Sequence, residues 1–150
     1  MKTSLTYSLP IPPDTLTSVV RDSISHQGVY RGSIDFAVPL TTPVLAAADG
    51  VVTRVRDDSD RHGQDPIFGQ DVNYITIEHK NNELSEYLHL ALGSAKVKVG
   101  QKVRQGQQIA ETGLSGWLYA PHLHLMVYQK TKNPQDFQCL EIQLRQPSNS

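Results

Sequence analysis

Short runs of alternating apolar and polar residues, each ended by a turn-forming residue, constrain the fold of this chain more than any other feature. Residues 33–38 alternate, with Ile34 and Phe36 on one side and Asp35 on the other, and residues 122–127 alternate in the same way. Side chains two positions apart share one face of a β-strand, so each run predicts a half-buried strand. The pattern predicts an all-β fold, an antiparallel β-sheet sandwich-like domain with little helix.

Two pairs of apolar runs are separated by turn residues and predict hairpins. Asp49-Gly50 separates residues 44–48 from residues 51–55, and Asp-Gly between apolar runs favours a tight two-residue turn. Asn81-Asn82 separates two further apolar runs. We expect each pair of runs to form adjacent antiparallel strands.

Composition limits the chemistry available to the chain. Its 150 residues predict one domain. A net charge of -1 gives no reason to expect nucleic acid or an anionic membrane as a partner. One cysteine excludes an intramolecular disulfide and a multi-cysteine zinc site, so nitrogen and oxygen must hold any metal. No apolar run approaches the ~20 residues that span a bilayer.

Of the six histidines, His62 and His79 stand among polar neighbours and are expected to be incidental, with His79 solvated.

Three predicted strands carry the candidate chemistry. His122 and His124 share one side of their predicted strand, roughly 7 Å apart. Tyr87 and His89 are likewise expected to share one face of theirs. Asp35 is a carboxylate in the middle of an apolar strand, where burial without a partner is costly. A metal ion and a nearby arginine would each explain Asp35.

The order of these motifs resembles the LytM/lysostaphin-type zinc metalloendopeptidases, which cleave cell-wall peptides. The resemblance runs from about His26 to Val127. It is carried by Ile34-Asp35-Phe36-Ala37-x-Pro39, Thr42-Pro43-Val44, Asp49-Gly50-x-Val52, His79, Tyr87-Leu88-His89-Leu90, Val97-Lys98-Val99-Gly100, Thr112-Gly113 and Pro121-His122-Leu123-His124. The family's fold is an antiparallel β-domain of the duplicated hybrid motif type, which agrees with the all-β prediction.

The resemblance implies one zinc ion per chain, held by a histidine, the strand aspartate and the second histidine of His-x-His. Asp35 and His124 match directly. The short form of the motif has its first histidine four positions before the aspartate, where this chain has Arg31, which cannot bind zinc. A longer variant has Ser-His-x-Gly further upstream, and the matching Ser25-His26-Gln27-Gly28 makes His26 the predicted third ligand. The fourth zinc position is then left for water, whose pKa the metal lowers from 15.7 to about 7.

The resemblance also assigns His89 and His122 to catalysis. One of them deprotonates or orients the water, and the other stabilises the oxyanion or protonates the leaving amine. The residues leave open which histidine has which role. Tyr87, Trp117 and Tyr119 are expected to contact the substrate, a peptide of peptidoglycan cross-links or stem peptides.

We expect an extended lead-in packed on the domain over residues 1–25, a zinc metallopeptidase domain over residues 26–130 and a C-terminal tail over residues 131–150. The family implies a periplasmic or extracellular location, although the first residues carry no signal peptide. One alternative is a degenerate, metal-free family member that acts as a cell-wall-binding or regulatory module. A carrier or phosphotransfer domain of related architecture is another, but the tip of the first predicted hairpin has no lysine.

Overall fold

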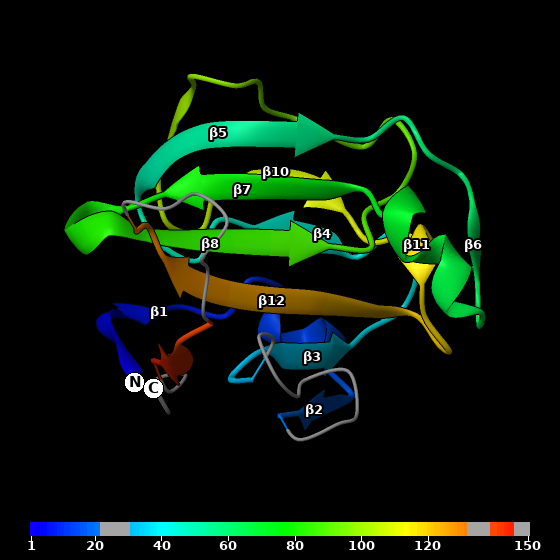
Figure 1. The fold of residues 1–150 in the computed structure, drawn as a ribbon, viewed down its shortest axis with the longest axis horizontal. Coiled ribbons are helices and arrows are strands. Elements are labelled where there is room, and N and C mark those ends of the chain that lie inside the picture. Colours follow the sequence, from blue (N-terminus) through cyan, green and yellow to red (C-terminus); the bar gives the residue numbers. More distant parts are fainter. Residues whose placement is uncertain (22–30, 132–138, 146–150) are drawn as a thin grey trace.

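The computed structural model describes residues 1–21, 31–131 and 139–145 (Figure 1). Within these residues the largest sheet has seven strands, and every neighbouring pair in it is antiparallel. In spatial order its strands are β2 (Ser18–Val20), β3 (Ile34–Ala37), β12 (His122–Gln129), β8 (Glu83–Leu88), β7 (Tyr74–Glu78), β5 (Gly50–Arg56) and β9 (Lys102–Val103).

Three two-stranded sheets accompany the large one among the residues that the structure describes. They are the parallel pair β1 (Lys2–Tyr7) and β13 (Glu141–Leu144), the antiparallel pair β4 (Pro43–Leu45) and β10 (Gln108–Glu111), and the parallel pair β6 (His62–Gly63) and β11 (Gly116–Trp117). The helical segments in the described part of the chain are the short 3₁₀ turns η1 (Pro13–Thr15), η4 (Pro66–Asp71) and η5 (Lys80–Asn82). Among the described residues, no helix has the length and apolar character needed to cross a membrane. The all-β prediction is confirmed.

The two faces of the large sheet differ, as the alternation predicts. Phe36 and Leu125 are fully buried on one face and belong to the same core cluster as Val44 of β4. In Figure 1, β4 and β10 lie behind β7 and β8. Full burial of each such side chain contributes about 1.5–3 kcal/mol to folding. Asp35 and His124 alternate with these core residues and therefore project from the opposite face.

The two predicted hairpins differ in outcome. β7 and β8 pair as expected around Asn81-Asn82, and both asparagines have a left-handed φ, 60° and 59°. The hairpin predicted at Asp49-Gly50 is wrong, because β4 pairs with β10 whereas β5 pairs with β7 and β9. Gly50 serves a close approach instead, since a Cβ there would lie 2.6 Å from the side chain of Ile77.

Candidate metal centre

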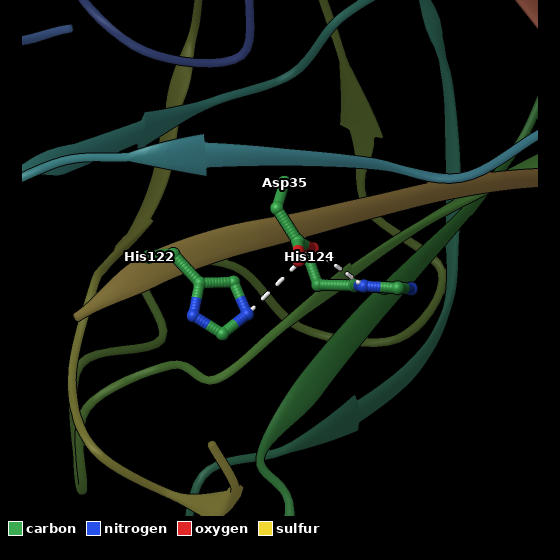
Figure 2. A group of neighbouring side chains, drawn as sticks. All are labelled: Asp35, His122 and His124. Atoms are coloured by element: carbon green, nitrogen blue, oxygen red, sulfur yellow. Dashed lines mark hydrogen bonds and ion pairs between the residues drawn. The ribbon is translucent and has the colours of Figure 1, made fainter. Parts of the chain in front are cut away.

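Asp35 and His124 face each other across neighbouring strands. The register of β3 and β12 sets these two residues opposite one another. Nδ1 of His124 lies 2.8 Å from Oδ1 of Asp35 (Figure 2). The flanking residues Leu123 and Leu125 are fully buried in the core, which directs His124 to the other face of the sheet. The structure thus brings together two of the predicted zinc ligands.

His122 completes a cluster with this pair. Its Nε2 lies 3.6 Å from Oδ1 of Asp35 (Figure 2), and the ligand atoms of Asp35, His122 and His124 all lie within 4.8 Å of one another. Nδ1 of His122 lies 2.8 Å from the carbonyl oxygen of Ala120. A carbonyl oxygen only accepts, so in the neutral ring Nδ1 carries the hydrogen and Nε2 turns its lone pair toward the carboxylate.

This arrangement fits a bound cation. A histidine lone pair that faces a carboxylate is repelled by it unless a proton or a metal ion lies between them. Two imidazole nitrogens and one carboxylate oxygen are donors that suit zinc, and a histidine ligand usually donates its second N–H to a carbonyl or carboxylate. Within the described part of the chain, this is the one group of three metal-ligating side chains that converges in this way.

His89 reaches the cluster through a break in strand geometry. β8 ends at Leu88, and His89 has a φ of 71°, in the left-handed region that residues other than glycine rarely adopt. Continued alternation would have set His89 on the core face beside Tyr87. Instead its ring centroid lies 4.5 Å from that of His122 and 6.2 Å from that of His124.

The environment of His89 keeps its ring neutral. The side chain is buried, and Nδ1 lies 2.7 Å from the carbonyl oxygen of Ser115, so Nδ1 carries the hydrogen. Burial first, and then the neighbouring His122, lower the pKa of His89 to about 3. At pH 7 the lone pair of this ring is therefore on Nε2.

Tyr87 lies on the face opposite the cluster, so the expectation that it shares a face with His89 is wrong. It is fully buried opposite Leu125, and its hydroxyl accepts a 2.9 Å hydrogen bond from the backbone N–H of Ala47. Ser85 Oγ lies 2.9 Å from the same hydroxyl. Burial raises the pKa of Tyr87 to about 12. The structure does not bring this side chain to the histidines.

The two other aromatic residues predicted to contact substrate lie on the segment that leads into β12. Trp117 belongs to β11, and its indole N–H donates a 3.1 Å hydrogen bond to the carbonyl oxygen of Gln64. That bond ties the segment to the polar loop that follows β5. Tyr119 is 70% exposed and is open to contact with a ligand.

The remaining histidine predictions have different outcomes. His26 lies outside the described residues, and Arg31, at the position of the short-form ligand, is exposed. His79 was expected to be solvated but is buried, which corrects that expectation. Its Nδ1 lies 2.6 Å from the carbonyl oxygen of Asp49, and its Nε2 lies 2.7 Å from Oγ of Ser85.

Two residues near the cluster escaped the sequence patterns. Asn73 and Ser115 are both buried, and both make hydrogen bonds to the segment that contains His89. An asparagine just before an apolar strand looks like an ordinary turn residue, and a serine in a glycine-containing loop is equally unremarkable. Neither position carries a signal that marks it without the tertiary structure.

Comparison with known proteins identifies the family. The model of "Peptidase family M23" matches residues 29–137. The chain is similar to the peptidoglycan DD-endopeptidase ShyA of Vibrio cholerae, with 38% identity over 112 residues, which is 75% of this chain and 22% of that protein. It spans between 22% and 31% of the length of the first curated relatives that it matches.

Solved structures agree with this match. A zinc containing peptidase from Vibrio cholerae superposes with a TM-score of 0.62 at 30% identity, over 91% of this chain and 40% of that one. The catalytic domain of lysostaphin from Staphylococcus simulans gives a TM-score of 0.55 at 25% identity, over 91% of this chain and 86% of that one. The resemblance inferred from the motifs is confirmed: the chain belongs to peptidase family M23.

Proposed function

We propose that this chain is a zinc metalloendopeptidase that hydrolyses peptide bonds of peptidoglycan. The observation that carries the proposal is the convergence of Asp35, His122 and His124, whose ligand atoms all lie within 4.8 Å of one another on the face of the sheet opposite the core. The buried ring of His89 stands beside them. The peptidoglycan DD-endopeptidases among the relatives support the choice of substrate class.

Asp35 and His124 would hold the zinc ion, with His26 rather than His122 as the third ligand, because Nε2 of His122 lies farther from Asp35 Oδ1 (3.6 Å) than Nδ1 of His124 does (2.8 Å). The antiparallel register between β3 and β12 supports this pairing, because it sets both donors at one level of the sheet before any ion binds. When bound, zinc lowers the pKa of water and polarises the scissile carbonyl group. No sulfur donor is needed, which agrees with the single cysteine of the chain.

His122 and His89 would carry the proton transfers. Carbonyl oxygens of Ala120 and Ser115 hold the Nδ1–H of these two rings, 2.8 and 2.7 Å away. Each neutral ring then presents a lone pair on Nε2, which accepts a proton from the attacking water and, once protonated, returns it to the leaving amine. Fixing the tautomer in this way supplies an oriented base without a further charged residue.

The substrate would lie across the face that carries the cluster. Tyr119 is exposed on the segment before His122 and would contact the peptide, and Trp117 would shape the adjoining loop. Tyr87, buried on the core face, has no part in this contact.

The test combines zinc content with hydrolysis of purified peptidoglycan by the 150-residue chain. We expect one zinc ion per chain in the wild type, loss of zinc in Asp35→Asn, His124→Ala and His26→Ala, and retention in the matched variant Arg31→Ala. His122→Ala and His89→Ala should keep zinc and lose activity by about 10²–10⁴-fold. A chain that binds no zinc after dialysis against zinc at neutral pH would overturn the proposal and favour the metal-free binding module.

A further inference from the structure

We infer that Asn73 is a positioning residue for His89, acting together with Ser115. The inference rests on the proposed function insofar as it concerns catalysis, because His89 is a catalytic residue only in that proposal. It begins from the backbone of His89, whose φ of 71° is a strained conformation for a residue other than glycine. Such a conformation persists only where surrounding groups determine it.

Asn73 supplies the groups that hold this backbone in place. It is fully buried just before β7, and its carbonyl oxygen accepts hydrogen bonds from the backbone N–H of His89 at 3.1 Å and of Leu90 at 3.3 Å. Its side-chain Nδ2 donates to the carbonyl oxygen of Leu90 at 3.1 Å. One residue thus binds the backbone N–H of His89 and both the N–H and the carbonyl oxygen of Leu90.

The same asparagine reaches the loop that holds the imidazole ring. The backbone N–H of Asn73 donates a 2.9 Å hydrogen bond to Oγ of Ser115, and this hydroxyl donates to the carbonyl oxygen of Leu90 at 2.8 Å. The carbonyl oxygen of Ser115 then lies 2.7 Å from Nδ1 of His89. Ser115 therefore links Asn73 to the ring of His89 through two hydrogen bonds, one at its hydroxyl and one at its carbonyl oxygen.

Asn73 also binds the polar loop after β5. Its Oδ1 accepts a 3.1 Å hydrogen bond from the N–H of Ser59, and its Nδ2 donates a 2.7 Å hydrogen bond to the carbonyl oxygen of Ser59. Every polar group of Asn73 is thereby paired, in a site from which water is excluded. A network satisfied to this degree is rigid, and a ring fixed by it keeps one orientation.

The chemistry of the site requires an amide at position 73. Nδ2 donates to the carbonyl oxygens of Ser59 and Leu90, while Oδ1 accepts from the N–H of Ser59. Aspartate has the same shape but no donor when it is ionised, so it would set a carboxylate against both carbonyl oxygens. Alanine would leave these groups buried and unpaired.

Matched serines separate positioning from general stability. Ser115 and Ser85 are both buried, and the hydroxyl of each makes two hydrogen bonds. The hydroxyl of Ser85 bonds to the ring of His79 and to the hydroxyl of Tyr87, both on the core side of the sheet and away from the ring of His89. Ser115→Ala and Ser85→Ala should therefore lose similar stability, while only Ser115→Ala disturbs His89.

The kinetic test uses peptidoglycan hydrolysis at a temperature at which all variants are folded. We expect Asn73→Asp, Asn73→Ala and Ser115→Ala to lower kcat by roughly 100-fold, since a misplaced catalytic group costs about that much. KM and zinc content should stay close to the wild-type values, as should both kinetic constants of Ser85→Ala. If the Asn73 variants fail to fold, Ser115→Ala carries the test. Equal kcat values in Ser115→Ala and Ser85→Ala would overturn the inference.

A spectroscopic test keeps the inference separate from the proposed function. Nitrogen-15 NMR of the imidazole rings should show His89 with a hydrogen-bonded, slowly exchanging Nδ1–H in the wild type and in Ser85→Ala. That resonance should be lost or shifted in Ser115→Ala and in the Asn73 variants. If the wild type shows no peptidase activity, this measurement still decides the matter, and an unchanged His89 resonance in the variants would overturn the positioning role.

Discussion

The phenolic hydroxyl of Tyr7 donates a 3.0 Å hydrogen bond to Oε1 of Glu83, a carboxylate that is only 1% exposed. Oε2 of Glu83 accepts hydrogen bonds from the backbone N–H of Ser4 at 2.6 Å and from its hydroxyl at 2.8 Å, and Oε1 accepts a further one from the N–H of Leu5. Burial, and then the adjacent Glu83, raise the pKa of Tyr7. One buried carboxylate thus fastens β1 to the first residue of β8.

Removing this carboxylate should destabilise the fold. We expect Glu83→Ala to lower the free energy of unfolding by about 3 kcal/mol, because several buried donors lose their acceptor. Glu83→Gln keeps one acceptor oxygen and should have a smaller effect. Urea denaturation followed by circular dichroism measures both values. The exposed Glu141 on β13 offers a control, Glu141→Gln, which should stay within about 0.5 kcal/mol of the wild type. A similarly small effect of Glu83→Ala would show that these bonds add no net stability.

Gly113 should not tolerate a side chain. A Cβ at this position would lie 2.7 Å from the backbone nitrogen of Ala91, and the Gly113 N–H donates a 2.8 Å hydrogen bond to the carbonyl oxygen of His89. We expect Gly113→Ala to cost about 1–3 kcal/mol through overpacking. The displaced carbonyl of His89 should also lower kcat for peptidoglycan. Gly69→Ala, where a Cβ meets nothing within 4 Å, is the control and should match the wild type in stability and rate.

Tyr87→Phe separates a structural tyrosine from one that contacts substrate. The variant leaves the N–H of Ala47 buried without its acceptor, so it should cost about 1–3 kcal/mol of stability. The kcat and KM for peptidoglycan should stay unchanged below the melting temperature, since the hydroxyl lies on the core face. A rise in KM at unchanged stability would instead indicate that Tyr87 contacts substrate.

His79 should make stability depend on pH. Burial lowers the pKa of this histidine below its ordinary value of 6.5. At pH values between the lowered pKa of His79 in the folded chain and its ordinary pKa in the unfolded chain, the unfolded chain binds more protons than the folded one. The free energy of unfolding therefore rises with pH in this window, and stability falls as the pH drops below about 6.5. We expect His79→Gln to show a weaker loss of stability between pH 7 and pH 5 than the wild type. Both proteins are measured without zinc, and their other titrating groups are the same. Parallel plots of unfolding free energy against pH for the variant and the wild type would contradict this expectation.

The strand faces were predictable where local pattern and tertiary structure agree. The alternation of Ile34 and Phe36 with Asp35 placed the carboxylate on the face opposite the core, and the His-x-His pair followed the same rule. Burial of apolar side chains fixes the register of a strand, so a period of two is reliable along its length. The rule set Asp35 and His124 on the polar faces of their own strands, and only the pairing of β3 with β12 in the structure brings the two residues together.

The rule failed where single backbone angles depend on distant contacts. The left-handed His89 donates its backbone N–H to the carbonyl oxygen of Asn73, a contact that the sequence does not reveal. The polar neighbours of His79 suggested solvent exposure, yet its ring is covered in the fold and packs at 5.4 Å against Tyr7 of the N-terminal strand. Asp49-Gly50 resembled a hairpin turn, although its glycine is needed for a close approach to β7. Each of these mispredicted residues contacts a residue that is distant in the sequence.

The parallel pairing of β1 and β13 has a mechanical consequence. In a parallel pair, the start of the first strand and the end of the second lie at opposite ends of the ladder. Tension applied at Met1 and Arg145 therefore acts on this strand pair in shear. The hydrogen bonds from Glu141 N–H to Met1 O and from Arg145 N–H to Tyr7 O are then stretched at the same time rather than one after another. While this clamp holds, the pulling force passes through β1 and β13 and bypasses the strands that carry Asp35, His122 and His124.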